Sequence, residues 1–155
     1  MTHAERQILI QRYADGYEAV ADALAGATDA ELDARPAPGR WSAREIVHHL
    51  ADSEMTSAIR LRRLLVETDP LVQGYDQDAF ASRLFYDRPI GASLDAFRAA
   101  RASTVEILRR LNDADWTRSG RHSESGPYSM LDWLRIYSAH AHDHAAQIRR
   151  ARASG

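Results

Sequence analysis

Three segments of this chain begin with a Ser or Thr that is followed three positions later by an acidic residue. Each of these segments then continues as a long stretch whose apolar residues recur at helical spacing. The pattern is that of a capping box, in which the two side chains satisfy free backbone N–H groups at a helix N-terminus. The pairs are Thr2 with Glu5, Ser42 with Glu45 and Ser129 with Asp132, and they predict helices over about 3–25, 43–69 and 130–152.

A fourth helix is predicted between the second and the third of these. Ser93 is a candidate N-cap, and the segment that follows ends near Asn112. Its apolar stripe consists of Leu94, Phe97, Ala100, Val105, Leu108 and Leu111, and the stripe of the first helix consists of Ile8, Tyr13, Tyr17, Val20 and Leu24. Four amphipathic helices that each carry one apolar face are expected to bury those faces against one another.

The connections are long and irregular. Residues 28–40 contain two prolines and a glycine, with one short turn expected after Thr28. Residues 71–93 are interpreted as a crossover that contains a short helix over about 76–84, and residues 113–129 as a polar loop. No segment shows a convincing strand pattern. The sequence predicts an all-α, antiparallel four-helix bundle with long crossover connections, formed by a single domain over 1–155, and the up-down order of the helices stays open.

Composition excludes several classes of function. A net charge of −2 gives no overall attraction to nucleic acid or to an anionic membrane, and the cluster Arg60, Arg62 and Arg63 is interpreted as the solvated face of the second long helix. The chain has no cysteine, which removes disulfides, thiolate nucleophiles and thiolate metal ligands and favours the reducing cytoplasm. His, Asp and Glu remain as the residues from which a site would be built.

The segment YSAHAHDHAAQI in the last helix carries His140, His142 and His144. At about 100° per residue, His140 and His144 lie about 40° apart, whereas His142 is turned by roughly 200° from His140. His140 and His144 are therefore expected to point into the bundle, and His142 toward solvent or the bundle edge. The same inward stripe contains Trp133, Tyr137 and Ile148.

The second long helix supplies a third inward histidine. If Ile46 points inward, His49 is about 60° from that direction, whereas His48 points nearly opposite. A single buried histidine is commonly a hydrogen-bonded core residue, but three imidazoles on two helices are satisfied together by one divalent ion. Three protein ligands that leave one coordination position open are typical of a catalytic metal site.

Two carboxylates stand one helical turn after these histidines. Asp52 follows His49 by three residues, and Asp143 follows His140 by three, so that either would accept the ring N–H that does not face the ion. The alternative for Asp143 is solvation or an ion pair with an arginine. Glu54 faces a different direction from His49 and is a weaker candidate ligand.

The stretches WSAREIVHHLADSE and HSESGPYSMLDWLRIYSAHAHDHAAQI resemble the DinB-like family of four-helix metal-binding proteins, which includes bacillithiol and mycothiol S-transferases. The resemblance covers nearly the whole chain in order. In that family one ligand is the histidine directly before a leucine in the second helix and two form an HxxxH pair in the last helix, which implies His49, His140 and His144 here. It also implies a possible homodimer.

Two further features bear on the resemblance. The Trp-Ser opening of the second long helix and the His-x-Glu-x-Gly loop, here His122, Glu124 and Gly126, are similar to the family pattern. His122 would then lie at the mouth of the site, where it would bind substrate or carry a proton, although a loop histidine is commonly just exposed. Phe80 stands where the family often has tryptophan in the crossover, so the resemblance does not define the substrate pocket.

Three functions follow as hypotheses. A divalent ion (Zn, Ni, Fe or Mn) held by three imidazoles would activate a bound water or thiol. The resemblance implies transfer of a low-molecular-weight thiol, as a cosubstrate, to an electrophilic small molecule. The second hypothesis is hydrolysis of an amide or ester, with Glu124 or Asp52 as base. The third is a non-catalytic, stress-related protein whose metal site is structural or vestigial.

Overall fold

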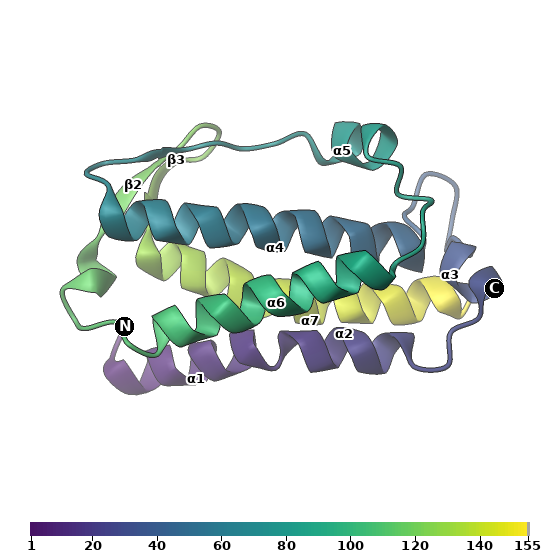
Figure 1. Ribbon diagram of the computed structural model, residues 1–155, viewed down its shortest axis with the longest axis horizontal. Coiled ribbons are helices and arrows are strands. Elements are labelled where there is room, and N and C mark those ends of the chain that lie inside the picture. The colour runs from purple at the N-terminus through teal and green to yellow at the C-terminus, as the bar shows by residue number, and fades with distance from the viewer. Residues whose placement is uncertain (155) are drawn as a thin grey trace.

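The computed structural model describes residues 1–154, in which four long helical units form a bundle (Figure 1). This confirms the predicted four-helix bundle. The units are α1 (His3–Ala14) continued by α2 (Gly16–Leu24), α4 (Ala43–Val66), α6 (Gly91–Leu108) and α7 (Met130–Arg152). The short helices α3 (Asp29–Asp33) and α5 (Gln77–Arg83) lie in the connections, as the turn after Thr28 and the helix over 76–84 were predicted to do.

The helix starts follow the capping signals with one exception. The three predicted capping boxes are all formed, so the N-termini of α1, α4 and α7 satisfy their first free N–H groups locally. The prediction for Ser93 was wrong, because α6 already begins at Gly91. The Ser93 hydroxyl instead lies 2.8 Å from Nδ1 of His48 across the packed α4 and α6.

The boundaries of the first two helices also differ from the prediction. The segment over 3–25 is interrupted at Asp15, and the side chain of Ile8 is exposed while Ile10 is buried in its place. The helix α4 ends at Val66, three residues before Asp69. Asp69 has a φ of 46°, which a continuing helix does not allow.

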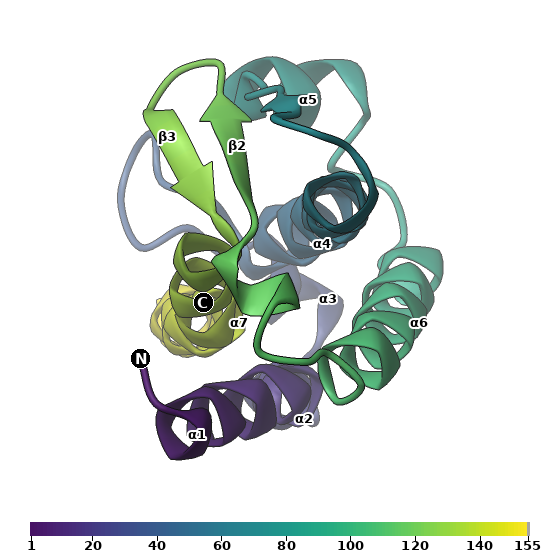
Figure 2. The same ribbon diagram turned by 90° about the vertical axis from the view of Figure 1, so that its left-hand side faces the viewer.

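The predicted antiparallel arrangement of the helices is only partly right, because the crossover makes two pairs of neighbouring helices parallel and so decides the up-down order that the sequence left open. The helices α4 and α6 run in the same direction, and α1–α2 and α7 run in the opposite direction (Figure 1). Around the bundle, α7 packs between α2 and α4, and α6 packs between α4 and α1 (Figure 2). Because α4 and α6 are parallel neighbours, the chain between them must return along the full length of the bundle, and the segment that contains α5 does this.

A small sheet corrects the expectation that the chain has no strand. It consists of β1 (Leu71–Val72), β2 (Ser119–His122), which follows the 3-10 turn η1 (Asp115–Thr117), and β3 (Gly126–Ser129). The strands β1 and β2 are parallel, and β2 and β3 form an antiparallel hairpin that leads directly into α7. A Cβ at Gly120 would lie 2.4 Å from the carbonyl oxygen of Pro70, so only glycine allows β2 to approach the crossover this closely.

The bundle interior contains a polar cluster among its apolar side chains. Glu54 is 1% exposed and forms an ion pair of 2.7 Å with Arg101, which is also 1% exposed. The Tyr13 hydroxyl donates to the same carboxylate, and Arg101 also donates to the Tyr13 carbonyl. Burial raises the pKa of Glu54, an effect that the Arg101 guanidinium opposes. This cluster joins α1, α4 and α6.

Two further observations concern the helices. His48, which was predicted to point away from the bundle interior, is fully buried between α4 and the start of α6, where its Nε2 lies 2.9 Å from the Arg88 carbonyl oxygen.

Within residues 1–154, no helix combines the length and the apolar character that crossing a membrane requires.

Candidate metal centre

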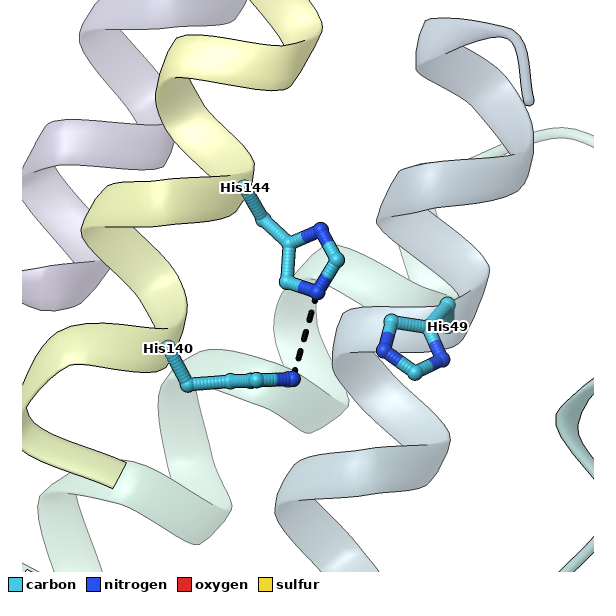
Figure 3. A group of neighbouring side chains, drawn as sticks. All are labelled: His49, His140 and His144. Atoms are coloured by element: carbon cyan, nitrogen blue, oxygen red, sulfur yellow. Dashed lines mark hydrogen bonds between the residues drawn. The ribbon is translucent and has the colours of Figure 1, made fainter. Parts of the chain in front are cut away.

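Three imidazoles from two helices meet at one point in the bundle. His49 comes from α4, and His140 and His144 come from successive turns of α7 (Figure 3). Their candidate ligand nitrogens all lie within 4.8 Å of one another, and the Nε2 atoms of His140 and His144 are 3.2 Å apart. The rings of His49 and His144 have centroids 4.8 Å apart. The structure therefore brings together the three histidines that the helical spacing predicted.

All three imidazoles are held in the neutral form. Burial lowers the pKa of His140 to about 2, helped by the neighbouring His144 and His49. Burial and the nearby His144 lower the pKa of His49 to about 4, and burial also lowers the pKa of His144. Near pH 7 each ring therefore has an unprotonated nitrogen, which is the form that binds a metal ion.

The orientation of His144 is set by Gln147, one turn further along α7. Nδ1 of His144 lies 2.6 Å from the Gln147 side-chain oxygen, and an amide oxygen only accepts, so Nδ1 carries the proton. The Nε2 that faces His140 is then the free ligand nitrogen. This partner was missed from the sequence, although its i+3 spacing was visible. His142 lies at the bundle edge, as predicted, and its Nε2 is 2.8 Å from the Arg12 carbonyl oxygen.

His49 is oriented by packing rather than by a carboxylate. Its ring lies against Trp41, with centroids 4.9 Å apart, and its buried Nδ1 has no hydrogen-bond partner among the described residues. Asp52 does not fill this role, because no hydrogen bond joins it to the unpartnered Nδ1 of His49 among residues 1–154, and its carboxylate instead accepts the Tyr86 hydroxyl at 2.7 Å. Asp143 is exposed and forms no hydrogen bond with a ligand ring within residues 1–154.

A cavity of about 260 Å³ opens beside the three imidazoles. His122 on β2 and Glu124 in the hairpin turn both line it, so the hairpin brings these two sequence-predicted residues to the site. Burial, together with the charge of Arg60, lowers the pKa of His122. Glu124 is exposed, and its carboxylate lies so close to Gly74 that a Cβ there would be 2.4 Å from it.

Arg60 contradicts its interpretation as part of a solvated helix face. Its side chain lies in the cavity wall and the residue is only 9% exposed. Nη1 donates to the Tyr137 hydroxyl at 3.0 Å, and Nη2 donates to the Gln73 carbonyl. The position was visible in the sequence, because Arg60 follows His49 by eleven residues, about 20° from an integral number of helical turns.

The donor set fits a divalent ion. Two imidazole nitrogens bound tetrahedrally to zinc at 2.0–2.1 Å are about 3.4 Å apart, and the Nε2 atoms of His140 and His144 are 3.2 Å apart. Because Nδ1 of His144 carries the proton, its Nε2 has a free lone pair that faces the His140 ring, and His140 presents a second lone pair at the same point when its own proton lies on Nδ1. His49, His140 and His144 would hold such an ion, and three nitrogen ligands accept zinc, nickel, iron or manganese.

Comparison with known proteins agrees with this site. The family model described as the DinB superfamily matches residues 12–148. A protein of Oceanobacillus iheyensis named "Putative metal-dependent hydrolase" is 36% identical over 118 residues, which cover 76% of this chain and 69% of that protein. "Putative metal-dependent hydrolase YfiT" of Bacillus subtilis is 35% identical over 125 residues, which cover 78% and 69% of the two chains.

Solved structures agree with the fold. The structure of YfiT from Bacillus subtilis, described as having an unusual four-helix bundle topology, superimposes with a TM-score of 0.90 at 28% identity and covers 96% of this chain and 86% of that chain. The four-helix bundle protein TT2238 has a TM-score of 0.66 at 22% identity, with 93% and 98% covered, and supports the fold alone. The match of the family model over most of the chain, together with the identity to these relatives, shows that the chain belongs to the DinB superfamily.

Proposed function

We propose that this protein is a metal-dependent hydrolase of a small amide or ester. The observation that carries the proposal is the convergence of three neutral imidazoles at the wall of a cavity of about 260 Å³. Relatives that are identical to this chain at about a third of the aligned positions carry the name "Putative metal-dependent hydrolase", which favours water over a thiol as the nucleophile.

A divalent ion bound by these imidazoles supplies Lewis acidity and lowers the pKa of a bound water. The chain itself supplies the groups that exchange protons with the reactants. Glu124 is the candidate proton acceptor, because among residues 1–154 its carboxylate is the only one that lines the cavity. His122 is the candidate hydrogen-bond donor. Its Nδ1 accepts the Glu124 backbone N–H at 3.3 Å, so the neutral ring carries its proton on Nε2.

Thiol transfer, the first hypothesis from the sequence, remains a prediction that no observation on this chain tests. The chain has no cysteine, so the thiol would have to come from solution. The same cavity would receive it, and an assay with and without an added thiol therefore separates the two reactions.

A purely structural metal site is disfavoured by the access to the three histidines. Structural zinc sites are closed by four protein ligands. Here the group of candidate ligands within the described part of the chain consists of three histidines, and all three line the cavity. A fourth position is thus available to a small molecule.

The proposal is tested by measuring hydrolysis of a panel of amides and esters by the metal-loaded protein, with and without a low-molecular-weight thiol. We expect turnover that requires the metal, that does not require the thiol, and that is lost in His144→Ala. Glu124→Gln should lower kcat while metal content stays unchanged, and His142→Ala should behave as the native chain. Turnover that appears only with the thiol would replace hydrolysis by thiol transfer.

A further inference from the structure

The cavity beside the three histidines is lined by a buried cation, Arg60, which has no counter-ion within residues 1–154. Arg60 is 9% exposed, and among residues 1–154 no carboxylate forms an ion pair with it. Its hydrogen bonds to the Tyr137 hydroxyl and the Gln73 carbonyl use two of the five guanidinium N–H donors. Its Nε is buried and has no hydrogen-bond partner in the part of the chain that the structure describes. Burial of an unpaired charge is costly, so a fold that retains one needs an anion from elsewhere.

The guanidinium belongs to the same cavity as the imidazoles. Arg60 and His49 lie on one face of α4, about 16 Å apart along the helix axis. Across the cavity, the Tyr137 hydroxyl accepts from Arg60, and the Tyr137 ring lies 5.9 Å from the His140 ring. Tyr137 therefore stands between the guanidinium and the imidazoles, so a molecule that reaches both must be several bonds long.

The charge of the cavity favours an anion. Imidazole ligands carry no charge and would leave the charge of a bound ion uncompensated, and Arg60 adds a further positive charge to the cavity lining. The positive charge of Arg60 also helps to lower the pKa of His122 on β2, which lines the same cavity. Among residues 1–154, one negative charge in the lining opposes these positive charges, and it belongs to the exposed Glu124 carboxylate.

We propose that Arg60 binds a carboxylate of the substrate, while the bond to be cleaved lies at the three histidines. This inference rests on the proposed hydrolase function and names its substrate class: an amide or ester that carries a free carboxylate, such as an N-acyl amino acid. A carboxylate suits a single guanidinium because the two groups match as planar pairs. A phosphate carries more charge and more terminal oxygens than one arginine satisfies. Arg60 is thus a specificity-determining residue of this cavity.

The first experiment uses the native chain and needs no variant. Binding of hippurate (N-benzoylglycine) and of hippuramide, its neutral amide, to the metal-loaded protein is measured by titration calorimetry. We expect hippurate to bind about tenfold or more tightly, the difference that a charge-assisted hydrogen bond typically makes. Equal affinities would overturn the proposal, and tighter binding of phenyl phosphate than of hippurate would overturn the choice of a carboxylate.

Variants then decide whether the carboxylate binds Arg60 or the metal ion, because both cations attract carboxylates. Arg60→Met should abolish the preference for hippurate, and Arg60→Lys should retain part of it. The matched control is Arg62→Met, because Arg62 lies on the same helix but donates to Ser103 and Thr104 on α6. This variant should prefer hippurate over hippuramide as strongly as the native chain does. A preference that survives in Arg60→Met would place the carboxylate on the metal and would overturn the proposal.

The two proposals fail in different ways. Metal content and the thermal midpoint of each variant show whether it is folded and loaded, and Arg60→Lys keeps the test valid if Arg60→Met does not fold. If the native chain prefers hippurate through Arg60 but hydrolyses nothing, only the hydrolase function fails. If the native chain hydrolyses neutral esters and amides as fast as analogues that carry a free carboxylate, only the role of Arg60 fails.

Discussion

The Nε2 atoms of His140 and His144 lie 3.2 Å apart, one helical turn from each other on α7, with His49 of α4 facing both (Figure 3). Burial keeps these rings neutral, so each has one unprotonated nitrogen, and for His144 this nitrogen is the Nε2 that faces His140. This relationship leads to the first two predictions.

Replacement of one ligand should remove the metal. After purification without a histidine tag and dialysis, elemental analysis should show about one divalent ion per native chain and a clearly substoichiometric content in His144→Ala. His142→Ala is the matched control, because His142 lies two residues away at the bundle edge and bonds only to the Arg12 carbonyl. Equal loss of metal in both variants would show that the ion is bound elsewhere.

Metal binding should stabilise the fold. A ligand at about one hundred times its dissociation constant adds about 2.7 kcal/mol to the free energy of unfolding, which corresponds to a rise of roughly 5–10 °C in the thermal midpoint of a domain of this size. Removal of the metal with a chelator should reverse the rise. His49→Ala should melt at the same temperature with and without added metal, and a metal-induced shift in that variant would count against the three-histidine site.

Gln147 should tune the metal affinity through His144. Its side-chain oxygen accepts the Nδ1 proton at 2.6 Å, and loss of such a partner typically weakens metal binding about tenfold or more. Gln147→Leu should show this loss in a competition titration against a chromophoric chelator. Gln147→Glu retains an acceptor and should restore the affinity. If both variants bind as the native chain does, the ring is oriented by other contacts.

Breaking the buried ion pair between Glu54 and Arg101 should strongly lower the free energy of unfolding. Glu54→Leu leaves the guanidinium buried without its partner and should lower the free energy of unfolding by about 3–5 kcal/mol in a denaturant titration. The control is Glu67→Ala, which breaks the exposed pair with Arg63 and should change the free energy of unfolding far less, because solvent screens that pair. The double variant with Arg101→Met should be less destabilised than Glu54→Leu, because it removes the unpaired charge.

The capping box of α7 should make stability depend on acid pH. The hydrogen bond from the Ser129 hydroxyl is the main cause that lowers the pKa of Asp132 below its ordinary value of 3.8. A lowered pKa in the folded state means that this carboxylate stabilises the fold above pH 4 and that the contribution is lost as the pH falls through the folded-state pKa. Asp132→Ala should therefore be less stable than the native chain at pH 7, and the difference should shrink as the pH falls below 4, as measured by urea unfolding. A difference that persists unchanged at pH 2 would contradict this origin.

The sequence by itself determined which histidines share a face, because the angle between residues on one helix is set by the helical period alone. His140 and His144 follow from their spacing of four, and the capping boxes located the N-termini of α1, α4 and α7 by contacts within four residues. The position of Arg60 on the His49 face was also available from spacing, but its charge favoured an exposed interpretation.

Only the tertiary structure decided which groups surround the three histidines. The path of the crossover made α4 and α6 parallel and paired β1 with β2, and that pairing placed His122 and Glu124 at the cavity. Burial of Arg60 likewise results from the crossover that supplies the Gln73 carbonyl. These contacts join segments that are far apart in the chain, and their formation depends on how several elements pack, so no local period in the sequence encodes them.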